Sequence, residues 1–138
     1  MTVQQGAGQR RVRVMVVEDD ALGLELVRDI LEEDGYEVLT ATDGANALAA
    51  IAESRPDLVL MDVQLPQISG LEVTRRLKAD PETRSIPVIA LTAHAMRGDD
   101  RSIVAEGCDG YISKPFKLAA FREAIAGYTS GGPRPVDE

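Results

Sequence analysis

The chain has almost no cysteine, no tryptophan and no long apolar run. Cys108 is the single cysteine of 138 residues, so an internal disulfide is impossible, and we expect this thiol to act as a small buried hydrophobe. No stretch approaches the ~20 apolar residues of a membrane span. The N-terminal residues also lack the hydrophobic segment of a signal peptide. These absences predict a protein of a reducing cytoplasm.

Basic residues are scarce as well. There are 15 Lys and Arg against 23 Asp and Glu, which gives a net charge of −8. Non-specific nucleic-acid binding depends on basic side chains that neutralise phosphates, so we expect no direct DNA binding. An acidic surface is the ordinary cause of such a charge, and an acidic metal pocket is the alternative.

The length and composition predict one globular domain with short tails. The hydrophobic fraction of 44% and the charged fraction of 28% are ordinary for a globular protein. The polar start and the Gly/Pro-rich end read as tails. We therefore expect a disordered lead over residues 1–11, a folded domain over 12–128 and a flexible tail over 129–138.

Hydrophobic periodicity alternates between strand and helix five times. In the expected helices, apolar stripes such as Leu22, Leu26 and Ile30, or Leu118, Phe121 and Ile125, would face inward. Alternation of this kind favours an α/β fold, in which helices cover both faces of a parallel sheet. The expected strands cover 12–17, 36–41, 57–62, 87–91 and 109–113, and the expected helices cover 21–34, 44–54, 71–79, 95–106 and 116–128.

Polar residues close or follow four of the five expected strands. Because ligands bind at the carboxyl ends of the strands in an open parallel sheet, these side chains should converge in space. They comprise three carboxylates, one hydroxyl and one ammonium: Glu18, Asp19, Asp62, Thr92 and Lys114.

Such a set suits a divalent cation and a phosphoryl group. A rigidly held Asp62 could be a metal ligand, a nucleophile or both. Magnesium prefers oxygen ligands, and the absence of a His/Cys cluster argues against zinc. Ordinary roles compete with this interpretation: a solvated lysine for Lys114, a strand-ending β-branched residue for Thr92 and, for Glu18 and Asp19, a polar helix start. For Asp20 we favour a helix cap.

Four segments together resemble the receiver domain of two-component response regulators. They are Val-Val-Glu18-Asp19-Asp20, Leu-Met-Asp62-Val-Gln-Leu-Pro66-Gln-Ile-Ser-Gly70, Ala-Leu-Thr92-Ala93 and Tyr111-Ile-Ser-Lys114-Pro115-Phe116. The match extends over nearly the whole expected domain. It implies a flavodoxin-like, doubly wound (βα)5 three-layer sandwich, with a five-stranded parallel sheet in the order 2-1-3-4-5.

The resemblance implies a role for each strand-end residue. Asp62 would accept a phosphoryl group from a phosphohistidine on a sensor histidine kinase or a histidine phosphotransfer protein. Lys114 and Thr92 would contact the phosphoryl oxygens. Mg²⁺, for which Mn²⁺ can substitute, would be held by Glu18, Asp19, Asp62 and the backbone carbonyl of Gln64.

The resemblance also implies a conformational switch. Thr92 would move toward the phosphoryl group and Tyr111 would swing inward, although plain core packing is the simpler role for Tyr111. The output face would comprise the helix over 95–106, the fifth strand and the last helix. The small Ala93 would leave access to Asp62, and a cis Lys114–Pro115 bond would aim the lysine at the site. Gln64 and His94 occupy positions that tune phosphate lifetime in this family. For His94, an exposed loop histidine without a role is the simpler interpretation.

The function implied is that of a single-domain response regulator in a phosphorelay, of the CheY or DivK type. It would assist its own phosphorylation and dephosphorylation without being an enzyme in the usual sense. It would signal by contact with other proteins, and a phosphorylation-dependent dimer is one option. Met1 and the short tails favour a stand-alone protein. The alternatives are a receiver cut from a hybrid kinase or DNA-binding regulator, a degenerate receiver, and a haloacid dehalogenase-type phosphatase, which Gln64 disfavours because that class needs an Asp there.

Overall fold

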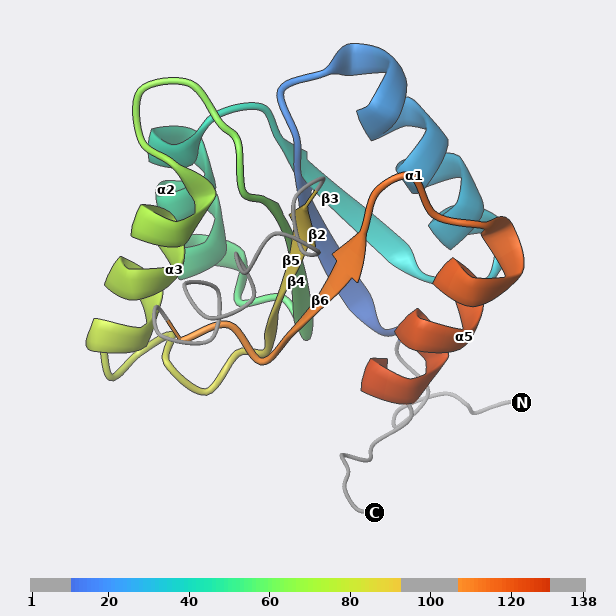
Figure 1. The fold of residues 1–138 in the computed structure, drawn as a ribbon. Coiled ribbons are helices and arrows are strands. Elements are labelled where there is room, and N and C mark those ends of the chain that lie inside the picture. Colours follow the sequence, from blue (N-terminus) through green and yellow to red (C-terminus); the bar gives the residue numbers. More distant parts are fainter. Residues whose placement is uncertain (1–10, 93–106, 130–138) are drawn as a thin grey trace.

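The computed structural model describes residues 11–92 and 107–129. Within these ranges, strands and helices alternate along most of the chain (Figure 1). The strands are β2 (Arg13–Val17), β3 (Glu37–Ala41), β4 (Leu58–Asp62), β5 (Val88–Thr92) and β6 (Gly110–Ser113). The helices are α1 (Ala21–Glu33), α2 (Gly44–Ser54), α3 (Gly70–Ala79) and α5 (Leu118–Thr129).

All five strands form one parallel sheet in the order β3-β2-β4-β5-β6. Counted along the chain this is the order 2-1-3-4-5, so the expected fold class is confirmed. Figure 1 shows α1 and α5 on one face of the sheet and α2 and α3 on the other. Because the strands are parallel, all of their carboxyl ends lie along one edge, with β2 and β4 as neighbours.

Each face of the sheet carries its own apolar core. β4 and β5 are buried along their whole length, as expected for central strands that helices cover on both sides. Their side chains alternate between the two cores. On one face Val59 and Met61 pack with Ile51 of α2 and Val73 of α3. On the other face the packed residues are Leu58, Leu60, Val27, Ile30, Leu31, Phe121 and Ile125.

Side-chain caps define where three of the helices begin. Asp20 accepts a hydrogen bond from the Gly23 amide at the start of α1, and Asp43 does the same for Asn46 in α2. Ser69 accepts from the Glu72 amide at the start of α3. These bonds satisfy amide groups that have no partner within a first helical turn. The expected capping role of Asp20 is therefore confirmed.

Element boundaries agree with the predictions to within two residues. β5 extends through Thr92, which was expected just after the strand. The last helix begins at Leu118, and Phe116 instead lies in the preceding loop with its ring stacked on Phe121 at 4.7 Å. The expected helix over 95–106, together with Ala93 and His94, falls outside the described residues.

Three leucines expected to face the core are exposed instead. Leu22, Leu26 and Leu118 keep 77%, 56% and 48% of their surface. In α1 the cause is helical geometry, since a spacing of four residues advances about 40° beyond a full turn at each step. Leu22 therefore lies about 80° around the helix from the buried Ile30. α1 presents apolar side chains on two different faces.

Among the residues that the structure describes, no helix combines the length and the apolar character that crossing a bilayer requires.

Buried and exposed large apolar side chains should differ sharply in their contribution to the free energy of unfolding. Phe121 is fully buried, so Phe121→Ala should lower the free energy of unfolding by about 3–5 kcal/mol. Leu22→Ala should change it by less than about 0.5 kcal/mol, because that side chain already contacts solvent. Urea unfolding followed by circular dichroism measures both. A similar loss in the two variants would contradict this description of α1.

Candidate functional site

Three carboxylates meet at the carboxyl edge of the sheet. Glu18 directly follows β2, and Asp62 is the last residue of the neighbouring strand β4. Each of Glu18, Asp19 and Asp62 offers an oxygen, and these oxygens all lie within 4.8 Å of one another. Two of the acids are almost fully enclosed, with Glu18 4% and Asp62 5% exposed, whereas Asp19 is open to solvent.

Backbone hydrogen bonds orient the two buried acids. The Gln64 amide donates to Asp62 Oδ1 at 3.0 Å, which holds the carboxylate toward the edge of the sheet. Glu18 is held through its own amide, which donates to the Ala41 carbonyl at 3.0 Å. The Asp20 amide donates to Glu18 Oε2 at 3.3 Å. Both side chains are therefore tied to the ends of rigid strands.

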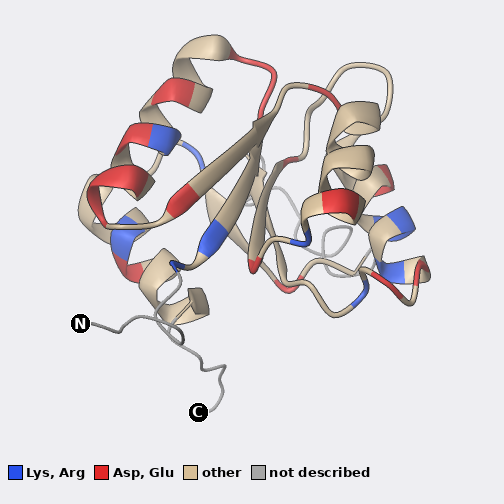
Figure 2. Cartoon of the chain, turned by 180° about the vertical axis from the view of Figure 1, so that it is seen from behind, with Lys and Arg blue, Asp and Glu red and all other residues tan. Residues whose placement is uncertain are grey.

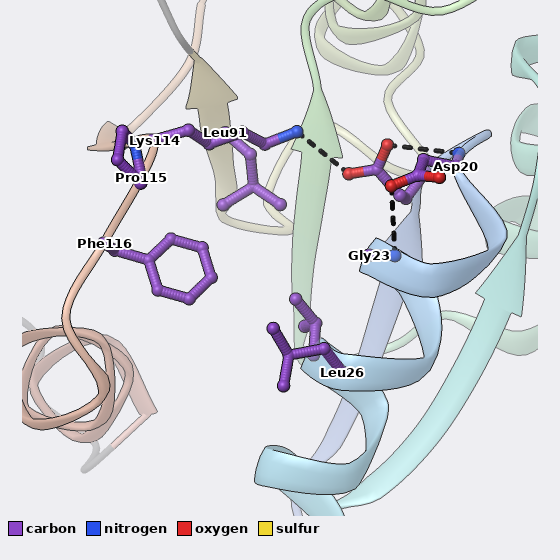
Figure 3. Close-up of a pocket in the computed structure, with 9 residues that line it drawn as sticks. Asp20, Gly23, Leu26, Leu91, Lys114, Pro115 and Phe116 are labelled. Carbon is purple, nitrogen blue, oxygen red and sulfur yellow. Dashed lines mark hydrogen bonds and ion pairs between the residues drawn. The ribbon is translucent and has the colours of Figure 1, made fainter.

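Lys114, which follows the edge strand β6, brings a positive charge to the same place. Its Nζ lies 2.9 Å from Glu18 Oε1 and 3.7 Å from Asp62 Oδ1. The lysine follows β6, and its amide donates to the Thr92 carbonyl at 2.8 Å. The Lys114–Pro115 peptide is cis, as expected. Figure 3 shows the lysine side chain extending from its loop toward the carboxylates beside α1.

Crowding of the carboxylates changes their proton affinities. Burial, followed by the hydrogen bond and charge of Glu18, raises the pKa of Asp62 to about 7. Burial also acts to raise the pKa of Glu18, but its hydrogen bond with Asp62 and the Lys114 ammonium together hold that pKa below its usual value. Asp62 therefore holds its proton more tightly than a free carboxyl group does, because two adjacent buried carboxylates resist simultaneous ionisation. A bound cation would relieve the same repulsion.

The two expected switch residues occupy neighbouring strands. Thr92 ends β5 and is buried, in register with Ser113 of β6. Tyr111, two residues earlier on β6, keeps 41% of its surface exposed. Its side chain is therefore not packed in the core.

A pocket beside the acids was not expected from the sequence. It has a volume of about 450 Å³ and lies between α1 and the loop that joins β6 to α5. Figure 3 shows Leu26 and Phe116 facing each other across it, with Leu91 and Lys114 beside them. The only signal in the sequence was the extra breadth of the apolar stripe in α1, which we had assigned to the core.

Comparisons with known proteins identify the family. The family model described as response regulator receiver domain matches residues 14–126. This chain belongs to the response regulator receiver domain family. It is 53% identical to the polar-differentiation response regulator DivK of Brucella anthropi over 115 residues, which cover 83% of this chain and 94% of the relative. DivK of Brucella ovis is 52% identical over the same share of both chains.

Solved receiver structures share the fold. The receiver domain of the sensor histidine kinase PA1611 from Pseudomonas aeruginosa superposes with a TM-score of 0.82 at 31% identity, covering 88% of this chain and all of that one. That structure has a magnesium ion in its active site cleft. The phosphorylated cyanobacterial phytochrome response regulator RcpA superposes with a TM-score of 0.78 at 28% identity, covering 88% and 96% of the two chains. The acid cluster of this receiver thus lies in a fold known to hold such a metal.

The raised pKa of Asp62 predicts how stability depends on pH. The folded protein binds the Asp62 proton more tightly than the unfolded chain, so this contribution is present at low pH and is lost as pH rises through about 7. Asp62→Asn cannot titrate. The variant should therefore gain roughly 2 kcal/mol relative to the parent between about pH 5 and pH 8 in the presence of a chelator. Chemical denaturation at each pH tests this, and a pH-independent difference would contradict it.

Proposed function

We propose that this receiver accepts a phosphoryl group on Asp62 from a phosphohistidine and then signals through protein contacts as a response regulator in a phosphorelay. The observation that carries the proposal is the meeting of Glu18, Asp62 and Lys114 at the carboxyl edge of the sheet. The DivK relatives, which match along nearly their whole length, support a single-domain regulator.

The donor set suits Mg²⁺, and Mn²⁺ would bind similar ligands. Glu18, Asp19 and Asp62 supply hard carboxylate oxygens, and the Gln64 backbone carbonyl would add another. Burial and the neighbouring Glu18 raise the pKa of Asp62 even with Lys114 close by, so this site would gain from the added positive charge of a cation. When bound, the metal neutralises charge on the transferring phosphoryl oxygens.

Transfer proceeds by in-line displacement. A carboxylate oxygen of Asp62 forms a bond to phosphorus while the bond from phosphorus to the histidine nitrogen breaks, and the electron pair stays on the imidazole. Lys114 compensates the charge of the phosphoryl oxygens, and the Thr92 hydroxyl donates a hydrogen bond to one of them. Water later attacks the same phosphorus, releasing phosphate and restoring Asp62. The protein thereby assists its own modification without being an enzyme that turns over a separate substrate.

The readout follows from movement of Thr92 toward the phosphoryl group. This movement would let Tyr111 turn inward from its exposed position and change the surface formed by β6 and α5. A downstream protein would recognise that surface, and dimerisation after phosphorylation would use it too. We place this signalling in the cytoplasm, where kinases and phosphotransfer proteins present their phosphohistidines.

α1 supplies a docking surface for the phosphodonor. Leu22 and Leu26 are both exposed on α1, and Leu26 lines the pocket together with Glu18. Acidic residues recur along the same helix (Figure 2), and Glu25, Asp29, Glu32 and Glu33 are all exposed. A helical donor with apolar and basic side chains would complement this surface and bring its phosphohistidine to Asp62.

Asp62→Asn should abolish phosphorylation by the cognate kinase and leave the fold intact, because the amide oxygen is a poor nucleophile. Radiolabel transfer from phosphorylated kinase measures the first, and circular dichroism measures the second. Asp57→Asn is the matched control, since Asp57 lies just before the opposite end of the same strand and accepts a hydrogen bond from the Arg13 amide. The assignment would be refuted if Asp62→Asn still took up the label. It would also be refuted if only Asp57→Asn failed to take it up.

Leu26→Arg should slow transfer from the kinase by about tenfold or more, because a charged side chain would enter an apolar contact. Phosphorylation by acetyl phosphate should hardly change, since that donor needs no docking surface. Ala52→Arg, an exposed position at the far end of α2, controls for the added charge. Equal loss with both donors would show that Leu26 acts on the chemistry and not on docking.

A further inference from the structure

The first residue of α3 lies directly against the backbone of Asp62. A Cβ atom placed on Gly70 would be 2.0 Å from the Asp62 carbonyl oxygen and 2.9 Å from its carbonyl carbon. It would also be 2.9 Å from Met61 Cγ. The nearest atoms belong to the main chain of a central strand, so they cannot move aside as a flexible side chain would.

Hydrogen bonds fasten the same junction. The Gly70 amide donates to the Val63 carbonyl at 3.0 Å, while the Val63 amide donates to the Leu91 carbonyl at 3.1 Å. Val63 is thereby held by α3 on one side and by β5 on the other. The bond between Gly70 and Val63 also closes the base of the loop that contains Gln64, whose amide orients the Asp62 carboxylate.

Thr74 holds the first turn of α3 from within. Its side chain is fully buried, and its hydroxyl donates to the Gly70 carbonyl at 2.9 Å. Cys108 Sγ, just before β6, lies 3.8 Å from the same hydroxyl oxygen. The start of α3 is therefore tied to its own helix as well as to the strand that ends at Asp62.

We infer that Gly70 and Thr74 are positioning residues for phosphoryl transfer, acting through the Asp62 backbone and the loop of Gln64. This inference rests on the proposed function. Close packing without a Cβ at Gly70 sets where α3 meets β4, and this contact sets the direction of the Asp62 carboxylate and the Gln64 carbonyl. Displacements of about 1 Å at a reacting group can cost a hundredfold in rate.

Gly70→Ala tests the inference, because its Cβ must push α3 away from Asp62. We expect Mg²⁺ affinity, measured by calorimetry, to fall about tenfold, and the phosphorylation rate from acetyl phosphate at saturating Mg²⁺ to fall by about tenfold to a hundredfold. Leu77→Ala is the control: it opens the core under α3 without touching Asp62. It should lower stability while leaving metal affinity and saturating rate within about twofold of the parent.

The outcome that overturns the inference is a Gly70→Ala protein with parental metal affinity and rate, or a Leu77→Ala protein with equal losses. If Gly70→Ala does not fold, Thr74→Val decides the question, because it keeps the side-chain volume and removes only the hydroxyl. Mg²⁺ affinity should then drop by about threefold or more, and Thr74→Ser should restore it. No change in Thr74→Val would refute the role of Thr74.

The proposed function has a separate point of failure. If the parent protein itself takes no label on Asp62, that function is wrong. If the parent is labelled and Gly70→Ala is labelled equally well, only the positioning role is wrong.

Discussion

Glu18 and Asp62 are two carboxylates buried side by side, and the cost of that arrangement governs the whole site. Removing a charge from water is expensive, and two like charges in contact add to that cost. The raised pKa of Asp62 reflects this cost, and the Lys114 ammonium, 2.9 Å from Glu18, offsets part of it. A bound cation would lower the same cost, and this is the physical basis of the metal binding and phosphoryl transfer that we propose.

The sheet makes this arrangement possible at a tolerable cost. β2 and β4 are neighbours, so Glu18, which follows β2, and Asp62, which ends β4, lie close together, and Lys114 reaches both from the end of β6. The strands are packed between two apolar cores, and this packing holds the strand ends, and hence the acidic side chains, at fixed positions. Gly70 adds a constraint of another kind, because the start of α3 packs against the main chain of Asp62, the residue that we propose as phosphoacceptor.

Much of this could be predicted from the amino-acid pattern. Alternating strand and helix periodicities gave the parallel sheet, and polar residues after apolar runs identified Glu18, Asp62 and Lys114. Errors arose where a helix carries apolar side chains outside its buried face. Leu22, Leu26 and Leu118 were assigned to the core because hydrophobicity alone does not distinguish a buried face from one that contacts a pocket or a partner. The cap formed by Asp20 was predictable because it depends only on neighbours in the sequence.

By itself the sequence determined the fold class, the strand ends and the kinds of chemical group at each, because these follow from local periodicity and residue type. Only the tertiary structure decided which acids shift each other's pKa, how closely Lys114 approaches Glu18, and where the pocket beside α1 opens. The tertiary structure also showed that Gly70 lies directly against the Asp62 backbone, with no room for a Cβ atom. These properties depend on distances between segments far apart in the chain, and such distances are set by packing.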